Sequence, residues 1–306
     1  MTMAAAKQVL SPSALDDEWS PLIIAVAPNG ARRTKSDHPS LPMTARESAE
    51  EAALCRDAGA AMIHLHVRDD DGRHSLDAAL YRDAISAIRS TVGDDLIIQV
   101  TTEAVGIYSA AEQMAMVQEV RPEAISTAVR ELIPDMESET TAAAFYEWAA
   151  AEEIAVQFIL YDDADVRRFA DLRQRGIIPG DVVSVLYVLG RYAKDQKSRP
   201  SDLLEFLDAA RDVGAEWHWS VCAFGALEGA CALSAASFGG HARVGMENNL
   251  YLNNGTLAPG NAALVRQVFD GAALFGRPVA TAAQARELVR SPAVRLPLKH
   301  LDPGEV

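Results

Sequence analysis

Eight short apolar runs that alternate with segments of helical periodicity constrain the fold of this chain more than any other feature. The runs cover residues 22–27, 61–67, 96–101, 124–129, 154–161, 182–189, 216–223 and 242–247, and each has the length of a buried strand. Between them, helix ends are recognisable, as in the capping box that begins at Thr44 and the C-terminal Gly59. Eight strands that are each followed by a helix predict a (β/α)8 TIM barrel, an α/β fold, over residues 22–306 as one domain.

A doubly wound sheet is the alternative architecture, and it usually carries a glycine-rich turn after its first strand. Here that turn, residues 27–32, reads Ala-Pro-Asn-Gly-Ala-Arg, and the chain holds no P-loop. Residues 1–21 have one early lysine and no long apolar stretch, so we expect a flexible leader that serves as a mobile tail or oligomer arm, not a secretory signal.

The charge balance of the chain excludes two classes of partner. Its 306 residues carry a net charge of −15, which opposes binding to nucleic acid or to an anionic membrane. No apolar run approaches the ~18 residues of a membrane span. The three cysteines, Cys55, Cys222 and Cys231, form no Cys-x-x-Cys pair and are odd in number, which is typical of a reducing cytosol. We therefore expect a cytoplasmic protein.

The pair His64 and His66 predicts a metal site. Both lie in the apolar run at residues 61–67, and side chains two apart on a strand point to the same face. In a TIM barrel the active site lies at the C-terminal ends of the strands, and the two histidines are at this end of the predicted second strand. Glu247 ends the eighth run, which lies next to the first strand and close to the second in a closed barrel. Two histidines and a carboxylate form a catalytic zinc pattern. The plain alternative for Glu247 is an ion pair with Arg243, four residues earlier.

Further polar residues end the other predicted strands and are expected at the same face. They are Thr101, Thr102 and Glu103 after the third, Ser126 and Glu131 after the fourth, and Tyr161 at the end of the fifth. Each residue type is also common in plain caps and loops.

Two basic segments follow predicted strands. Residues 191–199 contain four cations in nine residues, among them Arg191, Lys194 and Lys197, and suit a phosphorylated ligand such as a nucleotide-tailed thioester. A solvated surface loop is an equal alternative on charge alone. Arg32 belongs to a second basic cluster, with Arg33 and Lys35.

These segments resemble the β-keto acid cleavage enzyme family, whose founding activity is 3-keto-5-aminohexanoate cleavage. The resemblance covers roughly residues 22 to 290. Its most specific parts are Ile63-His-Leu-His-Val-Arg68 and Gly239-Gly-His-x-Arg-x-Gly-x-Glu247, and the Asn29-Gly-Ala31 turn and the tail from Arg277 to Arg286 also match.

The resemblance implies a zinc-containing barrel, usually a homotetramer, that converts a β-keto acid and acetyl-CoA into acetoacetate and a new acyl-CoA. It places zinc on His64, His66 and Glu247. The family arginine falls at Arg243 and a family hydroxyl residue at Thr101. Zinc and Arg243 would stabilise the negative charge that develops during condensation and cleavage.

The chain departs from the family pattern at three positions where the family has an acidic residue, and the reaction needs a base. Asn248 stands in place of an aspartate, Ile159 in place of an acidic residue on the fifth strand, and Arg32 in place of an acid after the first strand. Asparagine cannot take a proton at neutral pH, so Glu103 and Glu131 are the candidate bases. Arg32 is a candidate for binding an acidic substrate tail.

Three other functions stay open on the sequence. A zinc-dependent hydrolase on a TIM barrel also uses a His-x-His pair, although on the first strand and with later histidines. A non-catalytic ligand-binding relative would explain Asn248 and Ile159. A two-His-one-carboxylate iron oxygenase would differ in its metal content.

Overall fold

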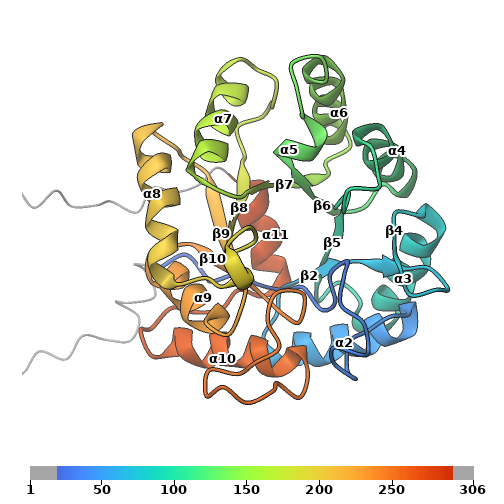
Figure 1. The fold of residues 1–306 in the computed structure, drawn as a ribbon, viewed down its shortest axis with the longest axis vertical. Coiled ribbons are helices and arrows are strands. Elements are labelled where there is room, and N and C mark those ends of the chain that lie inside the picture. Colours follow the sequence, from blue (N-terminus) through green and yellow to red (C-terminus); the bar gives the residue numbers. More distant parts are fainter. Residues whose placement is uncertain (1–18, 292–306) are drawn as a thin grey trace, which may run out of the picture.

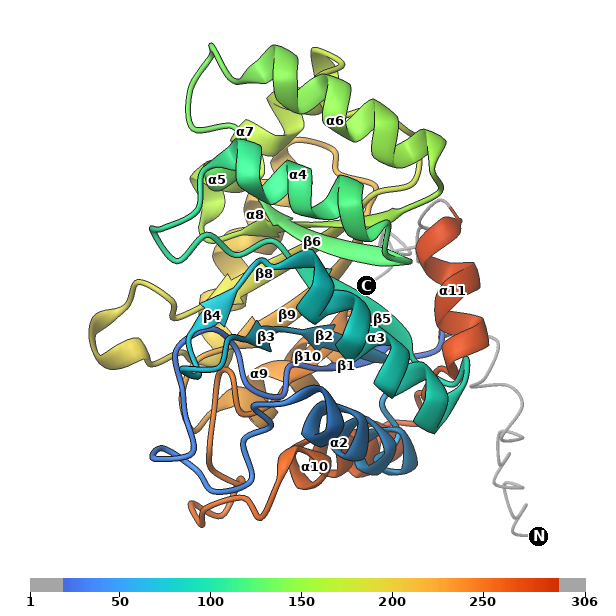
Figure 2. The same ribbon diagram turned by 90° about the vertical axis from the view of Figure 1, so that its right-hand side faces the viewer.

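Residues 19–291, which the computed structural model describes, contain eight parallel strands that close into a barrel (Figures 1 and 2). The order around the barrel is β1-β10-β9-β8-β7-β6-β5-β2. The strands are β1 Ile24–Val26, β2 Met62–Leu65, β5 Ile97–Thr101, β6 Ala124–Ala128, β7 Ala155–Leu160, β8 Ser184–Leu189, β9 His218–Ala223 and β10 His241–Val244. The predicted (β/α)8 barrel is confirmed. The predicted leader falls, except for residues 19–21, outside the described part, and the one-domain assignment stays a prediction.

Most α-helices form a ring outside the barrel, whereas α11 (Ala282–Arg290) lies across one end of it, as Figures 1 and 2 show. The other α-helices are α2 Ala45–Ala58, α3 Ala78–Val92, α4 Ala110–Val120, α5 Val129–Leu132, α6 Glu139–Ala151, α7 Asp163–Gln174, α8 Leu203–Asp212, α9 Glu228–Ser237 and α10 Asn261–Ala273. The predicted capping box at Thr44 starts α2, and Gly59 ends it with φ 112°. None of the helices within residues 19–291 is both long and apolar enough to cross a bilayer.

The second strand is shorter than the sequence pattern predicts. β2 pairs with β1 as far as Ile63 and with β5 as far as Leu65, and the chain then enters a two-stranded hairpin of β3 (Val67–Arg68) and β4 (His74–Ser75). His66 therefore lies just beyond the last paired residue of β2. This places it at the open C-terminal end of the barrel.

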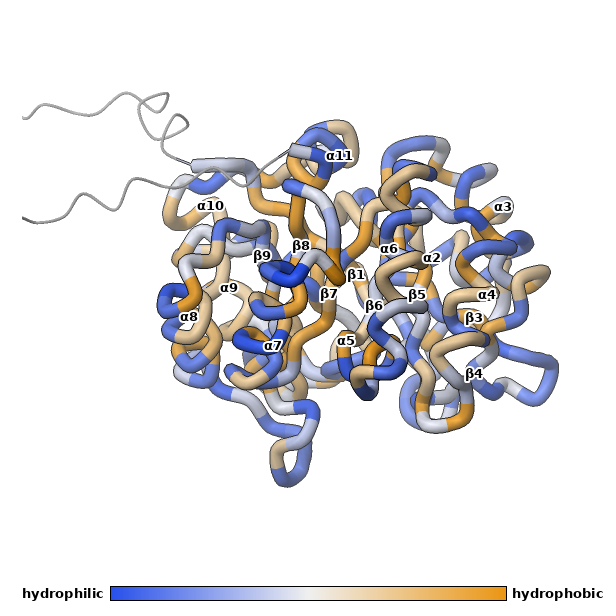
Figure 3. Tube along the Cα trace, turned by 90° about the horizontal axis from the view of Figure 1, so that it is seen from above, coloured by the Kyte–Doolittle hydropathy of each residue, from blue (hydrophilic) through white to orange (hydrophobic). Residues whose placement is uncertain are grey.

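Apolar side chains fill the layer between strands and helices, and Figure 3 shows the strands as the hydrophobic part of the trace. At the N-terminal ends of the strands, α11 packs its residues Ala285, Leu288 and Val289 against a cluster of strand residues that includes Met62 and Ile97. Figure 2 shows α11 at this end, opposite the β3–β4 hairpin. The barrel is thus closed at one end and presents loops at the other.

Glu123 is expected to stabilise the closed end in a pH-dependent way. Its carboxylate pairs with Arg286 of α11 and with Arg89 of α3, each at 2.5 Å. Although burial raises the pKa of Glu123, these two arginines hold it below its usual value. We expect Glu123→Gln to lower the free energy of unfolding by about 1–2 kcal/mol at pH 7, because bonds to charged groups are strong but this pair is partly solvated.

A carboxyl group whose pKa is lower in the folded than in the unfolded state stabilises the fold at pH values above its unfolded pKa. This stabilisation is lost as the pH falls through its folded pKa. The difference between the wild type and Glu123→Gln should therefore shrink below the usual glutamate pKa of 4.5. Urea unfolding at several pH values measures it. Glu119→Gln, which breaks an exposed pair with Arg82, is the control and should cost less than about 0.5 kcal/mol. If the difference in free energy of unfolding between the wild type and Glu123→Gln stayed constant across the pH range, the pH-dependent role of Glu123 would be contradicted.

Candidate metal centre

Three side chains from distant parts of the chain converge at the C-terminal end of the barrel. The Nε2 atoms of His64 and His66 lie 3.1 Å apart, and Oε2 of Glu247 lies 3.8 Å from the first and 3.3 Å from the second. Potential ligand atoms of the three residues all lie within 4.8 Å of one another. Both histidines are buried, and the Glu247 side chain is 13% exposed. The structure brings together all three predicted ligands.

The protonation of His64 suits a metal ligand. Its Nδ1 lies 2.8 Å from Oε1 of Gln99, which can only accept a hydrogen bond. The Nδ1 atom therefore carries the proton, and the lone pair of Nε2 faces His66 and Glu247. Burial, with a further effect of Arg243, lowers the pKa of His64 to about 3, so that the ring is neutral at physiological pH.

The Glu247 carboxylate divides its two oxygens between different partners. Oε1 accepts a hydrogen bond of 3.0 Å from Nη2 of the buried Arg243, which also donates to Sγ of Cys222. Burial alone would raise the pKa of Glu247, but Arg243 and the histidines hold it well below its usual value. Oε2 has no hydrogen-bond partner among the described residues. Glu247 thus forms the predicted alternative ion pair and still offers a charged oxygen to the histidines.

The dimensions and the donor set fit zinc. Tetrahedral zinc with bonds of about 2.0–2.1 Å separates its ligand atoms by about 3.3 Å; two of the distances found here, 3.1 and 3.3 Å, match this value, and the third, 3.8 Å from His64 to Glu247, is longer. Two neutral imidazole nitrogens and one carboxylate oxygen form a known catalytic zinc set that leaves a fourth position open. The unpartnered Oε2 of Glu247 is a buried acceptor that a cation would satisfy.

Side chains from the loop after β1 and from the first residues of α9 and α10 hold the backbone around Glu247 in place. Arg33 donates to the carbonyl oxygen of Met246 at 2.6 Å, and the side chain of Asn261 accepts from the Met246 amide at 2.7 Å. Buried Glu228 accepts from the Gly245 amide at 3.0 Å, and burial raises the pKa of Glu228 to about 8. The backbone on both sides of Glu247 is therefore fixed by side chains from three other segments.

Gly30 sets the position of the Glu247 side chain. It has φ +61°, and a Cβ atom at this position would lie 2.4 Å from Cγ of Glu247. We expect Gly30→Ala to lower zinc affinity by at least about tenfold, in the range seen for outer-shell changes, because Glu247 must move. A chelator competition assay measures this.

Gly214→Ala is the matched control for Gly30→Ala. Gly214 has a similar φ of +64° but no heavy atom within 4 Å of its would-be Cβ. Both variants should lose about 1–2 kcal/mol of stability from the left-handed backbone. Only Gly30→Ala should lose zinc, and equal zinc affinities in the two variants would rule out this steric role.

The hydroxyl groups of Thr101 at the end of β5, Thr102 after it and Ser126 within β6 differ in whether they are already hydrogen-bonded. The Thr101 hydroxyl accepts from the Glu103 amide at 3.1 Å, and the Thr102 hydroxyl donates to the Ser126 carbonyl at 3.1 Å, so that both serve the turn. The Ser126 hydroxyl is buried and has no partner among the described residues. Of the three, Ser126 is the one free to bind a ligand.

An ion pair spans the barrel mouth. Arg191, after β8, lies 2.9 Å from Glu103, after β5, and its guanidinium lies 5.4 Å from the Phe224 ring centre. β5 and β8 are separated by β6 and β7, so this contact crosses the opening. The structure therefore brings the two predicted residues together, and in it they neutralise each other.

Glu131, in contrast, has no cation partner among residues 19–291. Its Oε2 accepts from the Ala104 amide at 3.0 Å, and burial raises its pKa. Tyr161, directly after β7, makes an edge-to-face contact with Tyr192 at a ring-centre distance of 5.2 Å, and burial raises its pKa well above the usual value. Of the two candidate bases, Glu131 is thus the one without an ion pair and with a raised pKa.

The remaining predicted residues are either exposed in loops or buried without a hydrogen-bond partner in the described chain. Arg32, Lys194 and Lys197 are exposed, and only Lys197 has an ion-pair contact in the described chain, with Asp195 at 4.0 Å. Figure 2 shows the protruding loop that carries the two lysines. Asn248 is fully buried, yet neither polar atom of its side chain has a hydrogen-bond partner in the described chain.

Two members of the basic cluster after β1 do not face a ligand. Arg33 holds the Met246 carbonyl, and Lys35 pairs with Glu47 at 2.9 Å. The sequence grouped Arg33 and Lys35 with Arg32 in a basic cluster, and in the structure the charges of Arg33 and Lys35 meet groups within the protein. Sequence reasoning missed Glu228, and it included Gly30 only within the Asn29-Gly-Ala31 turn, without showing the close approach of Gly30 to Glu247.

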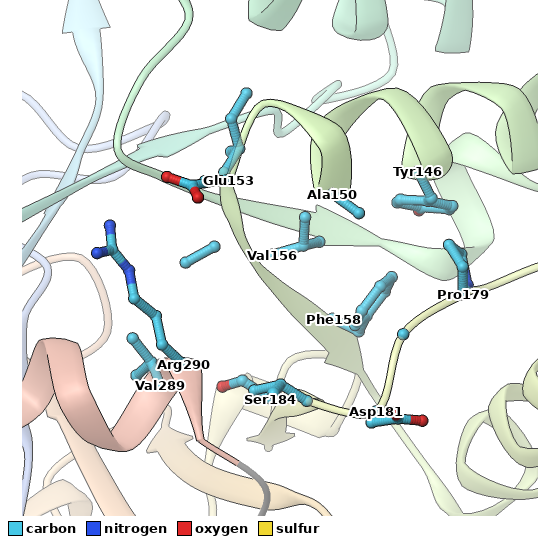
Figure 4. A pocket seen from close by; sticks show the side chains of 14 residues that line it. Tyr146, Ala150, Glu153, Val156, Phe158, Pro179, Asp181, Ser184, Val289 and Arg290 are labelled. Carbon is cyan, nitrogen blue, oxygen red and sulfur yellow. The ribbon is translucent and has the colours of Figure 1, made fainter.

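A separate cavity of about 380 Å³ lies at the opposite end of the barrel. Figure 4 shows it between Tyr146, Val156, Phe158, Ser184 and Arg290, near the first residues of β7 and β8. None of its lining residues belongs to the metal centre.

Comparison with known proteins gives a consistent result. Residues 21–290 match the β-keto acid cleavage enzyme family. The chain is 31% identical over 281 residues to a 3-oxoadipate:acetyl-CoA acetyltransferase of Cupriavidus necator, an alignment that covers 90% of this chain and 97% of the relative. It is 32% identical over 288 residues to a 3-keto-5-aminohexanoate cleavage enzyme of Fusobacterium nucleatum, with 88% and 97% covered.

Among solved structures, a ternary complex of ObcA with a C4-CoA adduct and oxalate has the same fold. The TM-score is 0.68 at 17% sequence identity, and the match covers 83% of this chain and 68% of that one. The apo structure of ObcA gives a TM-score of 0.67 at 17% identity, with 84% of this chain and 66% of that chain covered, so the chain spans about two thirds of the length of ObcA.

Proposed function

Because the chain belongs to the β-keto acid cleavage enzyme family, we propose that it exchanges acyl groups between a β-keto acid and acetyl-CoA at a zinc centre. The products are acetoacetate and the acyl-CoA of the keto acid's acyl group. The names of the relatives in Cupriavidus necator and Fusobacterium nucleatum support this reaction class. The predicted cytoplasmic location and tetrameric assembly stay predictions.

The observation that carries the proposal is the convergence of His64, His66 and Glu247 with a buried, unpartnered carboxylate oxygen. When bound there, zinc supplies Lewis acidity toward the oxygens of a β-keto acid. His64 stays a neutral ligand because burial lowers its pKa, and Glu247 supplies the negative charge. Iron in place of zinc is the alternative that metal analysis distinguishes.

Glu131 is proposed to take the proton from the carbon between the keto and carboxylate groups. Its raised pKa makes it a better base at neutral pH than an ordinary carboxylate, whereas Glu103 is paired with Arg191. The resulting carbanion forms a bond to the acetyl carbonyl carbon, and CoA leaves as its thiolate. The CoA thiolate then attacks the original keto carbon, and the bond between that carbon and the deprotonated carbon breaks, which leaves the acyl group on CoA. Protonated Glu131 returns its proton to the released carbanion, which leaves as acetoacetate.

Arg243 is proposed to stabilise the oxygen anions of both addition steps. Its side chain is 5% exposed and its Nε atom has no hydrogen-bond partner among residues 19–291, so one donor remains available. Ser126 and Asn248 are proposed to orient the substrate, because their buried polar atoms also lack partners. Thr101 and Thr102 support the turn beside them, and Tyr161 closes the substrate side of the mouth.

The two ends of the ligands are assigned by charge. Arg32 is exposed after β1 and has no ion-pair partner in the described chain, and we assign it to an acidic substrate tail. Lys194 and Lys197 are assigned to the phosphates of CoA, and Arg191 supports their loop. An acidic keto acid such as 3-oxoadipate is therefore the first substrate to test.

The test combines zinc-quantified protein, acetyl-CoA and a panel of keto acids that includes 3-oxoadipate and 3-keto-5-aminohexanoate, with mass spectrometry as the readout. Acetoacetate and a matching acyl-CoA in equal amounts are expected. Free CoA and acetate without acetoacetate would indicate a hydrolase. Ligand-induced thermal stabilisation without any product would indicate a binding protein.

A further inference from the structure

Polar residues occupy the barrel interior directly below His64. The interior layers of TIM barrels usually contain branched aliphatic side chains from alternate strands. Here Gln99, Gln157 and Ser220 come from the alternate strands β5, β7 and β9, and Ser184 of β8 joins them. Gln99 is 1% exposed and Gln157 is 8% exposed. Two amides inside a barrel need a reason, since buried polar groups without partners are costly.

Hydrogen bonds connect these residues to the metal centre in one continuous chain. Nδ1 of His64 lies 2.8 Å from Oε1 of Gln99, and Nε2 of Gln99 donates to Oε1 of Gln157 at 3.3 Å. Nε2 of Gln157 donates to the hydroxyls of Ser184 at 3.2 Å and Ser220 at 3.4 Å. Ser184 also lines the cavity in Figure 4, so the chain runs along the barrel interior from the metal centre toward its closed end.

The donor-to-acceptor direction of these hydrogen bonds decides which nitrogen of His64 can bind a metal. An amide has one accepting and one donating end, so Gln99 turns its oxygen to His64 when its nitrogen has an acceptor on the other side. That acceptor is Oε1 of Gln157. If Gln99 were reversed, its nitrogen would donate to Nδ1, and the proton of the neutral ring would move to Nε2. Nε2 would then have no lone pair for the metal.

We propose that Gln157 is a positioning residue that acts through Gln99 to keep the metal-binding nitrogen of His64 unprotonated and correctly oriented. This inference rests on the proposed metal centre. Gln157 itself has no hydrogen bond to His64, His66 or Glu247, and it is 58 residues away from Gln99 in sequence. Its effect on the metal is therefore transmitted by a single amide group.

The test measures zinc affinity by competition with a chromophoric chelator, together with the visible spectrum of the cobalt-substituted protein. Gln157→Leu removes the acceptor, and zinc affinity should fall about tenfold, as outer-shell changes do. Gln157→Glu keeps an acceptor toward Gln99, and its affinity should stay within about threefold of the wild type. The cobalt spectrum should change in Gln157→Leu and not in Gln157→Glu. This rescue distinguishes positioning from a loss of packing.

Gln113→Leu is the matched control, because Gln113 is another buried glutamine, on α4, without a bond to the metal centre. It should keep wild-type zinc affinity. If Gln157→Leu does not fold, Gln157→Asn, whose shorter amide cannot reach Gln99, replaces it. Equal zinc affinity in the wild type and Gln157→Leu would overturn this inference alone. Failure of the wild type to bind zinc would overturn the proposed centre, and the inference with it.

Discussion

Alanine in place of His66 is expected to abolish acetoacetate formation and to weaken zinc binding by more than about 100-fold, the upper end of the loss that outer-shell changes cause. His66 supplies one of only three converging ligand atoms, and its Nε2 lies 3.1 Å from His64 and 3.3 Å from Glu247. With one nitrogen and one oxygen left, the centre retains too few ligands to hold the metal. Metal analysis after dialysis and the acetyl-CoA exchange assay measure the two losses.

His218→Ala is the control for this variant. His218 begins β9 near the closed end of the barrel, and its Nε2 bonds to the carbonyl oxygen of Ser291 at 2.8 Å. Its replacement removes an imidazole of the same barrel and should leave zinc content unchanged. Full zinc content in His66→Ala would show that the metal lies elsewhere or that the protein binds none specifically.

Replacing Arg243 by leucine is expected to separate activity from metal binding. Arg243 pairs with Glu247 at 3.0 Å, and its loss leaves a buried carboxylate uncompensated, which costs about 3–5 kcal/mol in the zinc-free protein. Bound zinc compensates the same charge, so the loaded variant should be less destabilised. Turnover should fall about 10²–10³-fold, the usual effect of removing one oxyanion donor.

Arg243→Lys provides the comparison. It keeps the positive charge, so the zinc-free protein should recover most of its stability, while turnover should recover only partly because lysine lacks the planar fork of arginine. Thermal unfolding with and without zinc, combined with turnover, measures both effects. If Arg243→Leu loses zinc in proportion to activity, Arg243 supports Glu247 and has no separate part in the reaction.

Much of the fold could be predicted because it is encoded in local patterns. Each strand is a short apolar run, and the ends of α2 follow from Thr44 and Gly59, whose effects act within one helical turn. The length of β2 could not be predicted locally. The strand-like run extends over residues 61–67, but β2 ends at Leu65, where its pairing with the neighbouring strands stops.

The site, like the fold, could be predicted from the sequence only in part. His64 and His66 are two residues apart, so their common direction follows from the chain itself, and barrel closure made Glu247 a reasonable partner. Arg33 shows where this reasoning stopped. The sequence placed it in a basic cluster but did not show that its guanidinium donates to the Met246 carbonyl, 213 residues away in the chain. A charge in a sequence does not show whether another part of the protein already neutralises it.

The sequence by itself determined the barrel, the histidine pair and the residues that end the strands, because these depend on periodicity and on spacings of a few residues. Only the tertiary structure decided which of these groups already have a hydrogen-bond or ion-pair partner within the protein. It engages Thr102 in the turn, pairs Arg191 with Glu103, leaves Glu131 without a cation, and places Gln157 behind Gln99 and His64. Hydrogen bonds and ion pairs act over about 3 Å in space, and closing the barrel brings together residues that the sequence separates by tens to hundreds of positions.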